Sequence, residues 1–114
     1  MRTIIAGSRN ITNYALVVMA VANSGFNITV VLCGDARGVD MLGEEWAKDH
    51  NVPVEHYPAD WSRYGKRAGY IRNEEMGANA EALVAVWDGT SRGTEHMINI
   101  AREKDLKVYI EAVK

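Results

Sequence analysis

Two segments of the chain combine glycine, small polar residues and an arginine in a way that suits phosphate binding. Residues 34–40 read Gly-Asp-Ala-Arg-Gly-Val-Asp, and residues 88–94 read Asp-Gly-Thr-Ser-Arg-Gly-Thr. Glycine lets the backbone turn tightly and approach a ligand, and the exposed N–H groups at the start of a helix attract an anion. Arg37 and Arg92 would add guanidinium groups that donate paired hydrogen bonds to a phosphate. These segments predict a pocket for a phosphate-bearing ligand.

A shorter turn of the same kind, Gly7-Ser8-Arg9, follows the first apolar run of the chain. It lacks the longer glycine fingerprint of classical dinucleotide-binding folds and is a weak signal by itself. Three donor-rich turns nevertheless make a shared anion pocket a better explanation than three unrelated turns. The alternative is that the glycines only shape tight turns and that Asp40 only caps its helix.

A basic and aromatic segment, residues 58–67, has the sequence PADWSRYGKR. Four of the 13 Lys and Arg residues lie within it or just after it, and Trp61 or Tyr64 could stack on a nucleotide base. A solvated basic loop whose Trp61 covers the edge of the core is the alternative. Arg72 and Asn73, on the helix that follows, are expected to point into the same crevice.

Two carboxylates are candidates for catalysis. Asp88 follows an expected strand and could bind a ribose hydroxyl or act as a general base, although it could equally form a turn. Asp40 is the other candidate base. The complete set of residues predicted to bind the ligand is Gly7, Ser8, Arg9, Gly34, Asp35, Arg37, Gly38, Asp40, Trp61, Tyr64, Arg67, Arg72, Asn73, Asp88, Ser91, Arg92, Gly93 and Thr94.

No metal site is expected from the sequence. His50, His56 and His96 have no ligand spacing with one another or with Cys33, which is the single cysteine. Cys33 is interpreted as a small buried side chain at the end of a strand, and it can form no disulfide within the chain. The sequence requires no cofactor, and a nucleotide-type ligand is the expected small-molecule partner.

These turns must be positioned by alternating strands and helices. Continuously apolar runs predict strands that are buried on both faces of a parallel sheet, and apolar spacings of three and four predict helices between them. Parallel crossovers are right-handed, so the economical fold is a Rossmann-like, doubly wound, three-layer α/β sandwich. The expected strands are 3–6, 29–32, 54–57, 83–87 and 107–110, and the expected helices are 12–24 (capped by Thr12 and ended by Gly25), 38–50, one that holds Tyr70, Arg72 and Asn73, and 94–104.

The bulk composition is that of one folded domain. The chain has 114 residues, of which 47% are hydrophobic and 25% charged, and its formal net charge is −2. That charge gives no broad cationic field for DNA or anionic membranes, so any anion site must be local. The chain is apolar by Ile4 and has no apolar run long enough to span a membrane, so a cytoplasmic protein without a secretion signal is expected.

The expected helix at residues 12–24 is apolar nearly all round. A helix without a polar face is buried on more than one side, so this helix or its neighbour is expected to contact a second subunit. The sequence therefore favours a homodimer or a higher homo-oligomer.

Taken together, these motifs resemble the SLOG superfamily of Rossmann-like domains. That superfamily includes the DNA-processing recombination mediators and the lonely-guy phosphoribohydrolases, and the closest resemblance is to its small stand-alone YspA-type branch, a domain of unknown function. The resemblance spans nearly the whole chain. It rests on Gly7-Ser8-Arg9, on residues 34–40, on Pro58-Ala59-Asp60-Trp61, on Ala68-Gly69 with Arg72-Asn73, and on Ser91-Arg92-Gly93-Thr94.

The resemblance implies a pocket for a nucleotide or an NAD-derived, ADP-ribose-like ligand, and a sensor or sequestering module is the first hypothesis. A nucleotide hydrolase, either an N-glycosidase or a phosphohydrolase, is the second. Phosphoribohydrolases carry a catalytic glutamate three residues after the Gly-Thr pair, where this chain has Met97. Glu95 is expected to face elsewhere on the helix. Binding of single-stranded DNA, as in the recombination mediators, is the third hypothesis, and the acidic charge balance ranks it lower.

Overall fold

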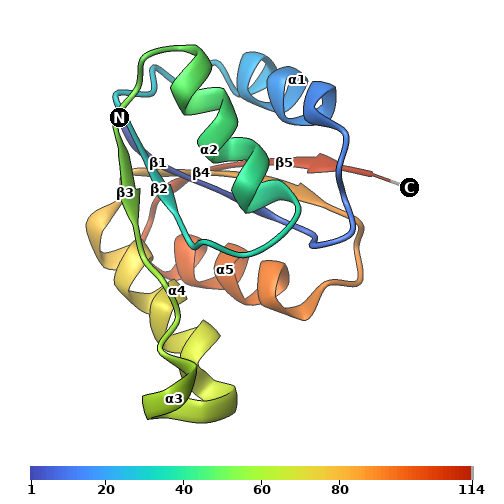
Figure 1. Ribbon diagram of the computed structural model, residues 1–114. Coiled ribbons are helices and arrows are strands. Elements are labelled where there is room, and N and C mark those ends of the chain that lie inside the picture. The colour runs from blue at the N-terminus through green and yellow to red at the C-terminus, as the bar shows by residue number, and fades with distance from the viewer. Residues whose placement is uncertain (114) are drawn as a thin grey trace.

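The computed structural model describes residues 1–113, and its centre is a five-stranded sheet with the order β3-β2-β1-β4-β5. All four strand pairs are parallel. Helices connect the strands, and Figure 1 shows α1 and α2 on one face of the sheet and α4 and α5 on the other. The elements are β1 (Arg2–Gly7), α1 (Tyr14–Ser24), β2 (Val30–Cys33), α2 (Val39–Asp49), β3 (Val54–His56), α3 (Trp61–Tyr64), the 3₁₀ helix η1 (Gly65–Arg67), α4 (Ala68–Asn79), β4 (Ala82–Trp87), α5 (Arg92–Glu103) and β5 (Lys107–Ala112).

This arrangement confirms the predicted Rossmann-like, doubly wound α/β fold. Successive residues of the central strands supply two separate cores, because side chains alternate between the faces of a sheet. Ile5 packs with α1 and α2, and its neighbour Ile4 packs with α4 and α5. A strand covered by helices on both faces buries nearly all of its side chains, which explains why β1 is apolar from Ile4 onward and β4 is apolar throughout.

One predicted end of α1 is confirmed, and the other is wrong by one residue. Gly25 ends α1 in the left-handed conformation with a φ of 69°, as predicted. Thr12 was the wrong choice of cap, because Asn13 caps the helix and its side chain accepts a hydrogen bond from the N–H of Ala15 at 3.0 Å. Threonine and asparagine are both good caps, so residue type alone does not decide between these adjacent positions.

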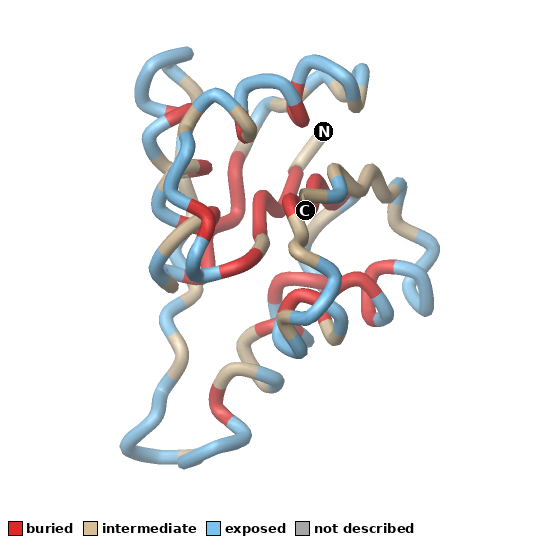
Figure 2. The backbone as a smooth tube through the Cα atoms, turned by 90° about the vertical axis from the view of Figure 1, so that its right-hand side faces the viewer, coloured by how far each residue is buried: buried red, intermediate tan, exposed pale blue. Residues whose placement is uncertain are grey.

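The connection from β3 to α4 is the most exposed part of the fold. It contains the short helix α3 and the turn η1, which have no buried residues. Figures 1 and 2 show this segment extending away from the sheet. The Asp60 side chain accepts a hydrogen bond from the N–H of Arg63 at 3.1 Å and so starts α3. We call residues 58–67 the arm.

Helix α1 is less enclosed than its sequence predicts, since Val18 and Met19 are exposed. The homo-oligomer expected from its apolar surface stays a prediction. Among the described residues, no helix is both long and apolar enough to cross a lipid bilayer.

Candidate ligand-binding site

The turns that leave β1, β2 and β4 converge on one cavity at the carboxyl edge of the sheet. The cavity lies where the strand order reverses, between β1 and β4, which is where open α/β sheets place their ligands. Its volume is about 220 Å³. We call it the inner compartment, and it is lined by Ala6, Gly7, Arg9, Ala36, Asp40, Arg72, Asn73, Met76, Ser91, Gly93, Thr94 and Met97.

Gly38 allows the turns after β1 and β2 to lie against each other. It has a φ of 74° and a ψ of −126°, a conformation that residues with a side chain avoid. A Cβ atom at this position would collide with the carbonyl oxygen atoms of Ser8 and Arg9. Gly38, which was predicted to approach a ligand, lines neither cavity of the site, and its close contact is with the turn after β1.

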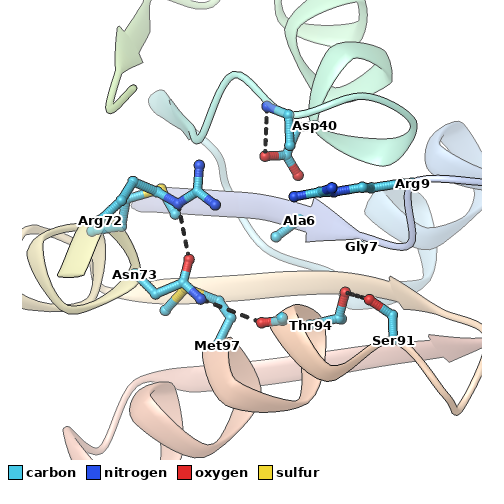
Figure 3. A pocket seen from close by; sticks show the side chains of 12 residues that line it. Ala6, Gly7, Arg9, Asp40, Arg72, Asn73, Ser91, Thr94 and Met97 are labelled. Carbon is cyan, nitrogen blue, oxygen red and sulfur yellow. Dashed lines mark hydrogen bonds between the residues drawn. The ribbon is translucent and has the colours of Figure 1, made fainter. Parts of the chain in front are cut away.

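Asp40 lies in the first turn of α2 and presents its carboxylate to the inner compartment (Figure 3). The residue is only 5% exposed, and its Oδ2 atom accepts a hydrogen bond from the N–H of Ala36 at 3.3 Å. Burial raises the pKa of Asp40 to about 6, although the Arg72 guanidinium and the N–H groups of Ala36 and Gly7 lower it in part. Asp40 therefore changes its protonation state near neutral pH.

Arg72 and Asn73 connect the β2 turn to the start of α5. The Arg72 guanidinium donates to the carbonyl oxygen of Gly34 and, through Nε, to Oδ1 of Asn73 at 3.1 Å. The buried Asn73 amide donates in turn to the carbonyl oxygen of Gly93 at 3.3 Å and to Nδ1 of His96 at 3.1 Å. Burial lowers the pKa of His96, which favours the neutral ring that can accept this bond. Both residues point into the crevice, where the sequence places them.

Arg9 extends across the mouth of the inner compartment towards Arg72 and Asp40 (Figure 3). Within residues 1–113, no hydrogen bond or ion pair holds its guanidinium group. Two guanidinium groups and one carboxylate of raised pKa therefore face the same space, which gives the compartment a positive balance of charge. An anion placed there would neutralise it.

A second cavity of about 330 Å³ adjoins the first and extends towards the arm. We call it the outer compartment. It shares Arg9, Ala36 and Arg72 with the inner compartment, so the two arginines lie at the junction of the two cavities. Its remaining lining residues are Gly34, Asp35, Arg37, Pro58, Ala59 and Trp61.

Two predicted ligand residues hold the backbone instead of facing either compartment. Ser8 is fully buried, and its Oγ atom accepts a hydrogen bond from the N–H of Asp88 at 3.0 Å. The Oδ1 atom of Asp88 accepts from the N–H groups of Thr90 and Ser91, both at 2.9 Å, and these bonds lower the pKa of Asp88. Asp88 lines a different cavity beside the start of α1, so Asp40 is the candidate base inside the site.

Three further predicted residues also lie outside the two compartments. Arg67 lines a cavity between α4 and α5, and Tyr64 packs beside the Arg63 guanidinium, which lies 5.1 Å from its ring centre. Arg92, in the first turn of α5, lines neither compartment. The structure therefore separates them from the arginines at the junction.

Sequence reasoning missed the apolar floor of the inner compartment. Met76 was not singled out, although it follows Asn73 by three residues and so lies on the same side of α4. Met97, noted only for the missing glutamate, is buried and lines the floor from α5. At the position where phosphoribohydrolases are expected to carry their catalytic glutamate, this chain has the thioether side chain of Met97.

The fold and the cleft define a Rossmann-like α/β domain with a binding site at the carboxyl edge of its sheet. The chain belongs to the YspA, cpYpsA-related SLOG family, whose sequence profile matches residues 1–64. It is also similar to the Gene 61 protein of Mycobacterium phage D29, with 36% identity over 117 aligned positions that span 94% of this chain and 93% of that protein. No solved structure matches the chain significantly.

Proposed function

We propose that this domain binds a phosphate-bearing, nucleotide-derived ligand and acts as a sensor or a sequestering module. The observation that carries the proposal is the junction of the two compartments, where Arg9 and Arg72 face one space at the end of a parallel sheet. A phosphate or diphosphate group at this point would receive charge-assisted hydrogen bonds from both arginines. The SLOG family membership supports a nucleotide-related ligand of this kind.

The two compartments suit different parts of such a ligand. The inner compartment offers the Asp40 carboxylate, the Asn73 amide and the Thr94 hydroxyl, which suit the hydroxyl groups of a ribose. The outer compartment offers the Trp61 ring and Pro58, which suit the flat face of a base. An ADP-ribose-type ligand, with its diphosphate at the junction, its terminal ribose inside and its adenosine outside, would use every polar group named here.

A thermal-shift panel of AMP, ADP-ribose, NAD and cyclic nucleotides tests the proposal. At least one of these ligands should raise the melting temperature at millimolar concentration, because a ligand that binds only the folded state stabilises it. Failure of the whole panel, with inorganic pyrophosphate included, would contradict the proposal.

Arg9→Ala locates the site, because the Arg9 side chain is exposed and holds nothing within residues 1–113. The variant should fold normally and bind the stabilising ligand roughly 10- to 100-fold more weakly, the effect of losing a charge-assisted hydrogen bond of about 1.5–3 kcal/mol. Arg102→Ala is the matched control, since Arg102 is an exposed arginine in the last turn of α5. Equal binding by the two variants would place the ligand elsewhere.

Hydrolysis of the bound ligand is a second candidate function, and the position of Asp40 favours it. A carboxylate with a pKa of about 6 inside the cavity is poised to accept a proton near neutral pH. Chromatography of AMP and NAD after long incubation with stoichiometric protein tests this idea, and Asp40→Asn should abolish any cleavage. Unchanged AMP and NAD would rule out hydrolysis for these two ligands.

A further inference from the structure

Four side chains of the types that bind metal ions meet beside the outer compartment, at the carboxyl ends of β2 and β3. Cys33 and His56 are paired across these two strands, Asp35 lies in the turn after β2, and Glu44 lies in α2. One ligand atom from each residue lies within 4.8 Å of the ligand atoms of the other three. Chain spacing gave no hint of this group, because strand pairing brings Cys33 and His56 together.

The separations between ligand atoms in this group lie on both sides of those around a tetrahedral ion, from 2.7 Å up to a limit of 4.8 Å. Nδ1 of His56 lies 2.7 Å from Oδ1 of Asp35, and Sγ of Cys33 lies 3.5 Å from the same oxygen. Glu44 contacts the other ring nitrogen, because its Oε1 atom lies 3.4 Å from Nε2 of His56. Bond lengths of about 2.0–2.3 Å place the ligand atoms of a tetrahedral zinc site roughly 3.3–3.6 Å apart. An ion would enter if the Asp35–His56 contact widened and the His56 ring turned, so that one ring nitrogen faces Asp35, Glu44 and Cys33 together.

We propose that Cys33, Asp35, Glu44 and His56 form a binding site for one divalent transition-metal ion of the zinc type. Burial raises the pKa of the Cys33 thiol, so the thiol would release its proton to solvent as the ion binds. The resulting thiolate, an imidazole and two carboxylates are a ligand set that favours Zn²⁺ or Co²⁺ over Mg²⁺ and Ca²⁺, which prefer oxygen atoms alone. Four protein ligands would complete a tetrahedral shell, which is the mark of a structural site. The ion would tie together the ends of β2 and β3 and helix α2.

The accessibility of the four residues fits the entry of an ion from solvent. Cys33 is 2% exposed and lies at the bottom, whereas the His56 side chain is 48% exposed and lies at the top. Asp35 adopts a φ of 59°, which is uncommon for a residue with a side chain, and it also lines the outer compartment. A bound ion would hold this turn in place, so the metal site would also stiffen one wall of the cleft.

Titration of the untagged protein with Co²⁺ tests the proposal, because Cys33 is the only cysteine of the chain. A near-ultraviolet charge-transfer band, which needs a cobalt–thiolate bond, must come from Cys33. We expect this band together with strong visible bands typical of tetrahedral Co²⁺, saturation at one ion per chain, and loss of both on addition of Zn²⁺. Absence of the charge-transfer band from folded protein in excess Co²⁺ would overturn the proposal and leave an ordinary ion-pair cluster.

Two histidine variants make the test specific. His56→Gln should lose most of the visible bands and the rise in melting temperature that Zn²⁺ gives the wild type. His50→Gln should keep both, because His50 stacks on Trp46 at the end of α2 and is not one of the four clustered residues. Melting curves in a chelator confirm that each variant folds. Equal Co²⁺ spectra for the two variants would overturn the assignment of His56.

Discussion

The inner compartment is lined by polar groups that already hold one another, whereas the outer compartment is lined by exposed side chains of the arm and of the β2 turn. Asp40 and Asn73 are buried and hydrogen-bonded, and Arg72 is fixed at both its Nη1 and Nε atoms. Trp61, in contrast, is 53% exposed on a short helix that has no buried residues. The first region is organised before a ligand arrives, and the second is not.

This difference has a consequence for recognition. A preorganised polar site loses little entropy on binding and discriminates sharply, because any donor or acceptor left unpaired inside it is costly. An exposed aromatic platform tolerates different bases, since every base offers a flat face. We therefore expect the inner compartment to set which sugar–phosphate group is accepted and the arm to add affinity with little base specificity.

Gly38→Ala should cause the largest loss of unfolding free energy, because it disturbs the turns that border the inner compartment. The new Cβ atom would meet the Ser8 and Arg9 carbonyl groups in a backbone conformation that alanine avoids, at a cost of roughly 2–5 kcal/mol in unfolding free energy. Gly89→Ala is the matched control, because Gly89 also has a positive φ, of 85°, but a Cβ there meets nothing within 4 Å. Denaturant melts of both variants should show a clearly larger loss for Gly38→Ala, and equal losses would mean that the contact between the turns is unimportant.

Asp40→Asn should stabilise the folded protein while weakening ligand binding. Opposite effects of this kind would show that Asp40 serves the binding site at a cost in unfolding free energy. The pKa of Asp40 rises from 3.8 to about 6 on folding, so its stabilising effect is full below pH 4 and is lost as the pH rises through 6. At 1.36 kcal/mol per pKa unit, ionised Asp40 costs the folded state about 3 kcal/mol above that range. Asparagine stays neutral and avoids this cost.

The measurement is the melting temperature of both proteins from pH 4 to pH 8, in a chelator. The melting temperature of Asp40→Asn should exceed that of the wild type by an amount that grows between pH 4 and pH 6 and levels off near pH 7. The titration of the other carboxylates does not affect this difference, because both proteins carry them. An advantage that is constant or falls with pH would show that burial does not dominate the environment of Asp40.

The strands, the helices and the meeting of three turns could be predicted, because they follow from continuous apolar runs and from the shared direction of parallel strands. The roles of individual side chains within the turns could not. Ser8 and Asp88 look like ligand-binding residues, yet both accept backbone N–H bonds, since the same atoms that bind a ligand also shape a turn. Only the three-dimensional path of the chain decides between these uses.

Side-chain contacts between neighbouring strands could not be predicted from the sequence either. The juxtaposition of Cys33 with His56 depends on β2 and β3 being adjacent in a particular register, which residue spacing does not encode. The role of Met76 could not be predicted for a different reason. An apolar residue on a helix is normally assigned to the core, and Met76 belongs both to the core and to the floor of the inner compartment.

Trp61→Ala should have the smallest effect and is the direct test of the arm. Its ring is half exposed, so removal should cost little stability and weaken nucleotide binding by about 1 kcal/mol, roughly fivefold, the low end of the range for a stacked base. Binding of inorganic pyrophosphate should not change, because the arginines at the junction remain. Tyr70→Ala is the control, since Tyr70 is also exposed but packs against His96 outside the two compartments. If Trp61→Ala weakens pyrophosphate and nucleotides equally, the arm shapes the phosphate site itself, and the division of labour between the two compartments fails.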